Sequence, residues 1–262
     1  MRSGSQPLFE CLPKYFARRG PLCTRGSGLI SPNMSRTASL HDKIDLTRER
    51  MARVLDEYGP DASAVAWTGG KDSTTVLYLW REILAERAPG APAKAISIDT
   101  GVKFPEIVAF RERIAAESNL DLHIVRPDVD IDDYPVAADK ASCCMDLKVA
   151  PLKNAVGKLG IAALMSGVRA DEHPDRAGRA WLENRNDPPH VMVNPILHWS
   201  EMDIWAFAMD KGLPYCELYD QGYRSLGCMP CTGPPGVGAG ERSGRDQDKE
   251  NVLKTLHSLG YF

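Results

Sequence analysis

Short apolar segments alternate with longer amphipathic ones through the middle of the chain, and this alternation limits the possible folds more than any other feature. The segments with the length and composition of buried strands are SAVAW (63–67), KAISI (94–98), LDLHIVR (120–126) and IAALMSGVR (161–169). After the first of them, apolar residues recur at helical spacing, at Val76, Leu79, Trp80 and Ile83. Because buried strands joined by helices form a parallel sheet, we predict an α/β fold with helices on both faces of that sheet.

Further helices are expected at residues 46–58, 105–118, 146–160 and 198–212, with Ser200 as the N-cap of the last one. In a parallel sheet that is covered on both faces, binding loops gather at the carboxyl ends of the strands. The sequence motifs that carry charge, glycine or cysteine follow such strand ends or lie in the C-terminal tail. We therefore expect one binding site, at that edge of the sheet.

Composition narrows the class of protein. The 262 residues are 43% hydrophobic, as is usual for a globular protein. Their formal net charge of -3 gives no support for a nucleic acid as the acceptor substrate. No apolar run approaches the roughly 20 residues that span a bilayer, so a cytoplasmic protein without a membrane partner is expected. The odd number of cysteines, 7, argues against a disulfide framework and for a reducing compartment.

The N-terminal segment differs from the rest. Residues 1–37 are rich in arginine and nearly free of acids, so we predict a disordered extension. It is either an organelle transit peptide or the result of a start codon assigned too early, with Met34 as the true start, and its prolines favour the second reading. The α/β domain with its cysteine segments is expected at 38–245, followed by a tail at 246–262.

A glycine pair lies between the first strand and its helix, in TGGKDS (68–73). The first N–H groups of a helix can bind phosphate oxygens where glycine lets the backbone approach, and a lysine there adds positive charge. The alternative is a tight turn with solvent-exposed charges. On the first interpretation the nucleotide-binding residues of this loop are Thr68, Gly69, Gly70, Lys71, Asp72 and Ser73.

This loop resembles the pyrophosphate loop of the adenine nucleotide alpha hydrolases, which have a Rossmann-like three-layer sandwich fold and cleave ATP between its α and β phosphates. Within that superfamily, SIDTGVKFPEIVAFRERIA (97–115), SGVRADEHPDR (166–176) and NPILHWSEMDIWAF (194–207) are similar to the phosphoadenylyl-sulfate (PAPS) and adenylyl-sulfate (APS) reductase-like family. The resemblance implies catalytic roles for Lys71, Ser73 and Arg169. It adds nucleotide-binding roles for Asp99, Thr100, Gly101, Gly167 and Arg169, and anion-binding roles for Lys148, Arg176, Arg242 and Arg245.

Two pairs of cysteines lie far apart in the chain, Cys143 with Cys144 and Cys228 with Cys231. Four thiolates can bind either a structural zinc ion or a [4Fe–4S] cluster, and their spacing does not separate the two. CCMDLKVAPL (143–152) and GCMPCT (227–232) are similar to segments of adenylyl-sulfate reductases, which carry a [4Fe–4S] cluster. The resemblance therefore implies a [4Fe–4S] cluster bound by these cysteines.

Two departures from the reductase pattern affect the chemistry. Those reductases attack sulfur with a cysteine near their C-terminus, whereas this sequence has no cysteine after Cys231, and Cys216 is expected to pack as a buried side chain. The loop also keeps Lys71, which the reductases commonly lose. A lysine for terminal phosphates favours ATP as substrate, with Mg²⁺ to stabilise the departing pyrophosphate.

We therefore predict an ATP-dependent enzyme of sulfur metabolism that adenylylates an unidentified acceptor, with a [4Fe–4S] cluster in a sulfurtransferase-type reaction. The alternatives are an APS or PAPS reductase that uses an external thiol, a protein similar to the small subunit of sulfate adenylyltransferase, and a non-catalytic nucleotide-binding regulator. The expected partners are ATP, the acceptor, and a sulfur donor or thiol-supplying protein. A homo-oligomer is also expected.

Overall fold

Six strands form one sheet in the order β3-β2-β1-β4-β6-β5. The structure, a computed structural model, describes residues 38–236 and 240–260, so the extension predicted at 1–37 lies outside the described residues. All neighbouring strands are parallel except β5 and β6, which are antiparallel. The strands are β1 (Ser63–Ala66), β2 (Ala93–Ile98), β3 (Leu120–Val125), β4 (Ala163–Met165), β5 (Leu182–Asn186) and β6 (Pro189–Val193).

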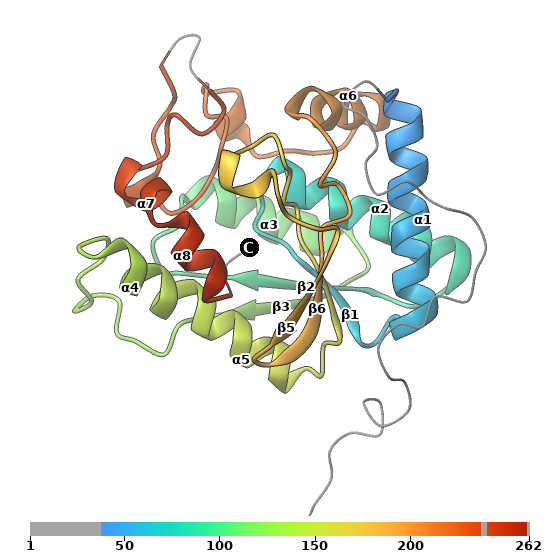
Figure 1. Cartoon of the computed structure of the whole chain (residues 1–262), viewed down its shortest axis with the longest axis horizontal. Coiled ribbons are helices and arrows are strands. Elements are labelled where there is room, and N and C mark those ends of the chain that lie inside the picture. The colour runs from blue at the N-terminus through green and yellow to red at the C-terminus, as the bar shows by residue number, and fades with distance from the viewer. Residues whose placement is uncertain (1–37, 237–239, 261–262) are drawn as a thin grey trace, which may run out of the picture. The chain divides into compact units, whose positions relative to one another are not determined.

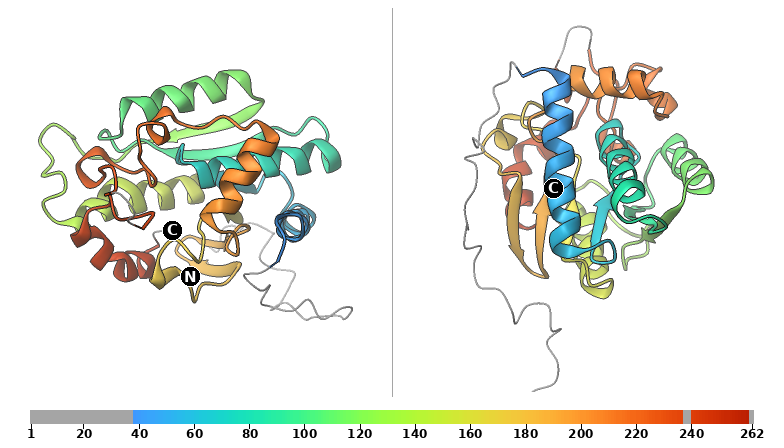
Figure 2. Two further views of the ribbon diagram at one scale, coloured as in Figure 1. Left: turned by 90° about the horizontal axis from the view of Figure 1, so that it is seen from above. Right: turned by 90° about the vertical axis from the view of Figure 1, so that its right-hand side faces the viewer.

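Helices cover both faces of this sheet, as Figures 1 and 2 show. One face packs against α1 (Leu40–Tyr58), α2 (Lys71–Arg87), α3 (Pro105–Glu117) and α6 (Glu201–Lys211), which share the larger apolar core. The other face packs against α5 (Ala150–Lys158) in a second core. Short helices α4 (Lys140–Cys144), α7 (Gln247–Asn251) and α8 (Leu253–Ser258) lie side by side beyond the strand ends.

The two cores reflect the alternation of side chains along each strand. Val65 of β1 and Ala95 of β2 belong to the core that contains α2, whereas Ala64 and Ile96 belong to the core that contains α5. Both faces of each central strand are therefore apolar, which explains why these strands appear in the sequence as continuous apolar runs. The predicted α/β fold, a mostly parallel sheet between two layers of helices, is confirmed.

The order of the strands places a crevice beside β1. The chain runs from β1 to β2 and β3 through α2 and α3 on one face, and returns through α5 on the other face to β4. The loops that follow β1 and β4 therefore diverge between two adjacent parallel strands. Ligands of doubly wound sheets bind at such a switch point.

The structure differs from the sequence prediction in the hairpin of β5 and β6. No strand was predicted at Leu182–Asn186, because this edge strand contains Glu183, Asn184 and Arg185 and has no apolar run. The predicted helix at 146–160 is also longer. It continues from α4 through a π-helical turn (Met145–Val149) into α5, and Pro151, which has no N–H to donate, lies just after this turn.

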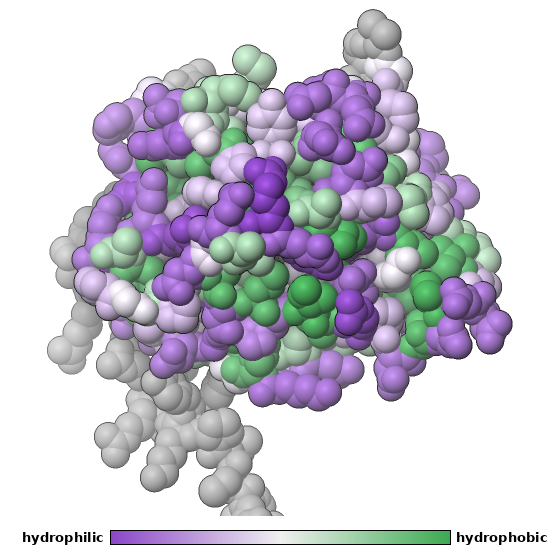
Figure 3. All heavy atoms as spheres, turned by 180° about the vertical axis from the view of Figure 1, so that it is seen from behind, coloured by the Kyte–Doolittle hydropathy of each residue, from purple (hydrophilic) through white to green (hydrophobic). Residues whose placement is uncertain are grey.

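The surface seen from behind carries mostly hydrophilic residues, and hydrophobic residues form separate patches between them (Figure 3). In the part of the chain that the structure describes, no helix is both long enough and apolar enough to cross a membrane.

Glu183 connects the edge of the sheet to the C-terminal helix. Its carboxylate lies 2.7 Å from Nε of Arg179, 2.9 Å from Nη2 of Arg185 and 3.3 Å from Nε2 of His257 in α8. Burial alone would raise the pKa of Glu183, but the hydrogen bonds from His257 and Arg179 outweigh it and lower the pKa from 4.5 to about 2. The carboxylate is therefore more stable in the folded chain than in the unfolded one.

We predict that Glu183→Gln lowers the free energy of unfolding at pH 7 by about 1 to 2 kcal/mol. This value is smaller than the pKa shift alone implies, because solvent screens the charges of a partly exposed network. Because the folded-state pKa is lowered, the stabilisation is complete above the unfolded-state pKa and disappears as pH falls from 4.5 towards 2. Urea unfolding of both proteins at a series of pH values measures this. An equal difference at pH 7 and pH 3 would contradict the assignment.

Candidate active site

Two adjoining cavities open at the switch point between β1 and β4. The first, called here the apolar cavity, encloses about 650 Å³ with its mouth included, and its walls are largely apolar. Its lining includes Trp67, Ile96, Ile98, Ile107, Leu152 and Leu226. The second, called here the polar cavity, encloses about 630 Å³ on the same basis, and its lining includes Gly70, Asp72, Ser73, Gly167, Arg176 and Arg242. Thr68, Leu226 and Arg245 line both cavities, so one ligand can extend through them.

The glycine loop shapes the start of α2 beside the polar cavity. Gly69 has a φ of +82°, a left-handed conformation that favours glycine, and a Cβ atom there would lie 2.9 Å from Cγ2 of Ile107. Gly70 is the N-cap residue and has no side chain that could cap the helix. The Oγ atoms of Thr68 and Ser73 are 3.0 Å apart across the loop. The 17-residue helix therefore presents its N-terminal dipole to the cavity.

The loop that follows β4 contacts the same helix start through Gly167. A Cβ atom on Gly167 would lie 2.6 Å from the backbone N of Ser73. Any larger residue would push the two loops apart. Gly167 was expected to bind the nucleotide, and in the structure it brings the β4 loop against the glycine loop.

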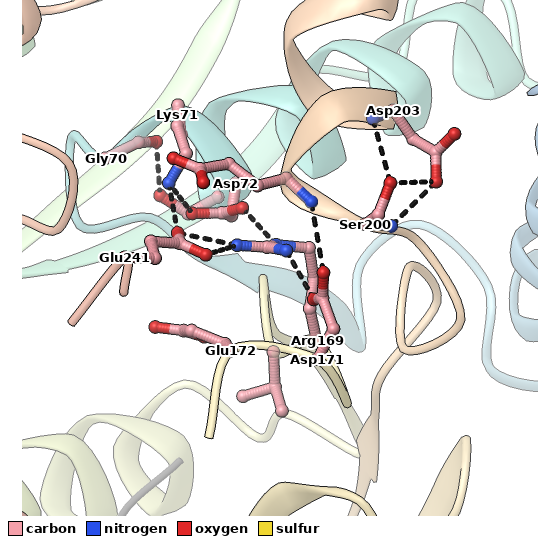
Figure 4. Close-up of polar contacts among 12 residues, drawn as sticks. Gly70, Lys71, Asp72, Arg169, Asp171, Glu172, Ser200, Asp203 and Glu241 are labelled. Atoms are coloured by element: carbon pink, nitrogen blue, oxygen red, sulfur yellow. Dashed lines mark hydrogen bonds and ion pairs between the residues drawn. The ribbon is translucent and has the colours of Figure 1, made fainter. Parts of the chain in front are cut away.

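Lys71 and Arg169 are buried in a network that we call the ionic cluster, which comprises Lys71, Asp72, Arg169, Asp171 and Glu241. Arg169 is 0% exposed, with Nε 2.6 Å from Oδ1 of Asp72 and Nη1 2.5 Å from Oδ1 of Asp171. Oε1 of Glu241 accepts hydrogen bonds from Nζ of Lys71 at 2.6 Å and from Nη2 of Arg169 at 2.6 Å. Figure 4 shows the Glu241 carboxylate between these two cations.

Further contacts fix Lys71. Its Nζ atom lies 3.1 Å from Oδ2 of Asp72 and 3.0 Å from the carbonyl oxygen of Arg224, and its backbone N–H donates to the Tyr219 hydroxyl at 2.8 Å. Burial alone would lower the pKa of Lys71, but Asp72, Tyr219 and Glu241 outweigh it and raise the pKa. The ammonium group is therefore charged, and its charge is already compensated by carboxylates.

Two of the predicted anion-binding arginines lie at the wall of the polar cavity in ion pairs. Glu172 pairs with Arg176 and with Arg242, whose Nη1 atom lies 2.5 Å from Oε1 of Glu172. Arg242 also donates to Glu250 at 2.7 Å from both Nε and Nη2. Burial would raise the pKa of Glu172, but Arg176 and Arg242 outweigh it and lower the pKa.

Arg245 is different from these residues. It is 5% exposed and lines both cavities, and a Cβ atom on Gly227 would lie 2.3 Å from its Nη atoms. Within residues 38–236 and 240–260, Arg245 forms no ion pair, and its Nε atom has no hydrogen-bond partner. Glu250 attracts it at longer range while bonded to Arg242. A buried guanidinium group without an ion pair favours the binding of an anion beside it.

The predicted cysteine ligands come together at a third, smaller cavity of about 280 Å³, called here the cysteine cavity. Cys143 and Cys144 reach it from the end of α4, and Cys228 and Cys231 from the two ends of a short 3-10 turn. Lys148 and Lys249 also line it. Among the described residues, no group of three or more His, Cys, Asp or Glu side chains is arranged to hold a metal ion.

Two of the four thiols, those of Cys143 and Cys228, contact polar groups. The backbone N–H of Ala137 donates to Sγ of Cys143 at 3.4 Å, and Oγ1 of Thr100 lies 3.4 Å from Sγ of Cys228. Burial would raise the pKa of Cys228, but Lys148 and the hydrogen bond with Thr100 outweigh it, and the pKa is about 7. Cys228 is therefore readily present as a thiolate.

The cysteine cavity and the apolar cavity share a wall. Cys228 and Lys148 line both. Lys103, which no motif indicated, lines the apolar cavity and pairs with Cys228 in an isolated β-bridge. Burial and the neighbouring Lys148 lower the pKa of Lys103 to about 8. Two lysines therefore meet where the cavities adjoin.

Some predicted residues lie away from the cavity linings. Asp99 pairs with Arg111 at 3.4 Å and with Arg126 at 3.5 Å, and a Cβ atom on Gly101 would lie 3.0 Å from Ile131. Asp99 and Gly101 shape the loop after β2 and line neither large cavity, whereas Thr100 between them lines the apolar cavity. Sequence analysis assigned no role to Lys103, Tyr219 or Glu241, although Lys103 lies in the segment 97–115 and Glu241 precedes Arg242, because the partners of these side chains come from distant parts of the chain.

Comparison with known proteins shows the family of the chain. Residues 62–234 match the model of the phosphoadenosine phosphosulfate reductase domain. The chain belongs to the phosphoadenosine phosphosulfate reductase family. The adenosine 5'-phosphosulfate reductase of Bacillus pumilus (strain SAFR-032) is 37% identical over 164 residues, which are 58% of this chain and 68% of that protein. The predicted family is therefore confirmed, and enzymes of sulfur metabolism are its named members.

Solved structures support the fold. The phosphoadenylyl-sulfate reductase of Candida auris, in a phosphate complex, has a TM-score of 0.59 and 21% identity, and the match covers 77% of this chain and 98% of that one. The FMN adenylyltransferase of Candida glabrata, in complex with FAD and inorganic pyrophosphate, has a TM-score of 0.61 and 23% identity, with 76% and 66% covered. One fold thus occurs in a reductase and in an adenylyltransferase.

We predict that Gly167→Ala destabilises the protein by about 1 to 3 kcal/mol, because the added methyl group overlaps the backbone of Ser73. The β4 loop should separate from the start of α2. Chemical unfolding measures the loss of stability. Gly178→Ala is the control, because a Cβ atom there meets no atom within 4 Å. Equal stability of the two variants would contradict the proposed close packing.

Proposed function

We propose that this chain binds adenosine 5'-phosphosulfate across the apolar and polar cavities and takes part in its thiol-dependent reduction to sulfite and adenosine monophosphate (AMP). The proposal is the reductase alternative from the sequence analysis. The names of the relatives support it at least as well as they support the ATP-dependent reaction. The observation that carries it is the position of Arg245.

Arg245 lies where the two cavities meet, buried and without an ion pair in the described part of the chain. A nucleotide places a flat base in an apolar space and an anionic group at its 5' end. The apolar cavity, with Trp67, Ile98 and Leu226 in its walls, suits the base, and Arg245 would then face the 5' phosphate. Lys71 and Arg169, by contrast, are already paired with carboxylates.

The reaction needs two thiols. A thiolate attacks the sulfur of the sulfate group, the bond from that sulfur to the phosphate oxygen breaks, and AMP leaves with the electron pair. A second thiolate then attacks the first thiol's sulfur and releases sulfite, so sulfur gains two electrons and the two thiols form a disulfide. Among the described residues, the only cysteine outside the cysteine cavity is Cys216, which is 1% exposed. The attacking thiol would therefore come from a partner molecule.

We also propose that the four cysteines of the cysteine cavity hold a [4Fe–4S] cluster. The donor set fits, because four thiols and two lysines line one space, and the lysines offset the negative charge that four thiolates bring. Each thiolate of such a cluster binds a separate iron, so the thiols need not converge on one point as around zinc. Bound there, the cluster would place a charged group behind the wall formed by Cys228 and Lys148.

A second candidate function is the ATP-dependent adenylylation predicted from the loop. The N-terminus of α2, with glycine as its N-cap residue and Lys71 as its first residue, is the observation that favours it. The Candida glabrata adenylyltransferase, which was solved with inorganic pyrophosphate, shares the fold. The acceptor would remain unidentified, and Mg²⁺ would be required to neutralise the departing pyrophosphate.

We predict that Arg245→Ala weakens AMP binding at least 30-fold, equivalent to about 2 kcal/mol, because a buried charged partner of the phosphate is lost. Titration calorimetry with anaerobically prepared protein measures this, with APS and Mg-ATP as further ligands. Arg87→Ala, at the other end of α2 and 42% exposed at its side chain, is the matched control. Tighter binding of Mg-ATP than of APS would instead support adenylylation.

A second prediction concerns the cysteines. Anaerobically purified protein should absorb near 400 nm and contain about four iron and four sulfide per chain. Cys231→Ser should lose most of both, whereas Cys216→Ser should keep them, because Cys216 is buried in the larger apolar core and lines none of the three cavities. A colourless protein with one zinc per chain would contradict the cluster.

A further inference from the structure

Glu241 is a member of the ionic cluster that comes from a distant part of the chain. Asp72 is adjacent to Lys71, and Asp171 is two residues from Arg169, so each belongs to the loop whose cation it holds. Glu241 is 170 residues from Lys71 and 72 residues from Arg169. It reaches the cluster from the segment that carries Arg242 and Arg245. The Glu241 carboxylate can therefore move out of the ionic cluster without unfolding the loop of Lys71 or the loop of Arg169.

The two cations keep their positions without Glu241. Lys71 still contacts Asp72 and the carbonyl oxygen of Arg224, and Arg169 still contacts Asp72 and Asp171. The oxygen that would be removed lies 2.6 Å from Nζ of Lys71 and 2.6 Å from Nη2 of Arg169. Two fixed cations that share one oxygen atom form a geometry that a phosphate oxygen also satisfies. The cluster is thus a preorganised anion site.

We propose that Glu241 fills, with its own carboxylate, an anion site for the terminal phosphates of a nucleoside triphosphate, and thereby excludes ATP. Asp72, which contacts both cations, lines the polar cavity together with Gly70 and Ser73 at the start of α2, so the site lies directly behind that wall. Charge fits the exchange, because pyrophosphate bound to Mg²⁺ has a net charge close to that of one or two carboxylates. Glu241 is therefore a specificity-determining residue.

This inference rests on the proposed function, because it assumes that a nucleotide binds in the apolar cavity with its 5' phosphate beside Arg245. Glu241 does not block that position. A ligand with one phosphate, or with a phosphosulfate, needs the apolar cavity and Arg245. A triphosphate also needs the oxygen position that Glu241 holds. The same chain would thus accept APS and reject ATP, although it keeps a lysine at the pyrophosphate loop.

The test compares Glu241→Ala and Glu241→Gln with the unmodified chain by calorimetric titration with magnesium pyrophosphate, Mg-ATP and AMP. Both variants should bind magnesium pyrophosphate and Mg-ATP at least 10-fold more tightly, with the larger gain for alanine, whereas the affinity for AMP should change less than 3-fold. Addition of Lys71→Ala to Glu241→Ala should abolish the gain. The glutamine variant retains hydrogen-bonding atoms and provides a folded protein if the alanine variant unfolds.

Glu82→Gln is the control for a general loss of negative charge, because Glu82 pairs with Arg48, lines none of the three cavities and contacts neither Lys71 nor Arg169. It should leave pyrophosphate affinity unchanged. Folded Glu241 variants that bind pyrophosphate no better than the unmodified chain would overturn the inference, and so would an equal gain in Glu82→Gln.

The outcomes separate the two proposals. Pyrophosphate contains no nucleoside, so its titration tests the anion site alone. If the unmodified chain binds neither APS nor AMP while the Glu241 variants gain pyrophosphate affinity, the proposed function fails and the anion site stands. If AMP binds and no gain occurs, the proposed function stands and the role of Glu241 in excluding ATP is refuted.

Discussion

The buried guanidinium group of Arg169 holds the site together. It joins the start of α2 through Asp72, its own loop through Asp171, and the C-terminal segment through Glu241. Three carboxylates compensate the charge of this buried cation, and removal of one partner from a buried ion pair costs several kcal/mol. The three segments are therefore fixed relative to one another by charge, above a sheet whose apolar cores fix only the strands and helices.

The sequence predicted those features that depend on local periodicity. The strands β1, β2 and β4 are buried on both faces, and β3 carries apolar residues between Asp121 and His123, so all four runs were visible. The carboxyl ends of β1 and β4 indicated the position of the site. The polar edge strand β5 was missed because its stability comes from pairing with β6 and not from burial. The helix α1 begins at Leu40, earlier than predicted, because Ser39 and Asp42 form a capping box that precedes the apolar pattern.

The sequence predicted many of the individual site residues, but it did not predict which of them contact one another. Glycines, cysteines and arginines were found because each residue type limits its own surroundings. Glu241 and Tyr219 could not be found in that way, since a carboxylate or a phenol becomes informative only when its partner is known. Lys71 illustrates the difference: the motif indicated a lysine for phosphates, and the fold supplies it with Glu241 at 2.6 Å and the Tyr219 hydroxyl on its backbone N–H at 2.8 Å.

The wall shared by the apolar cavity and the cysteine cavity links two places that the sequence separates. Cys228 and Lys148 contribute atoms to both spaces. A ligand that draws Lys148 towards one space alters the electrostatic potential in the other. By thermodynamic linkage, an occupant of the thiols and an occupant of the apolar cavity then change each other's affinity by the same factor. The wall thus couples two equilibria through a single lysine and a single thiol.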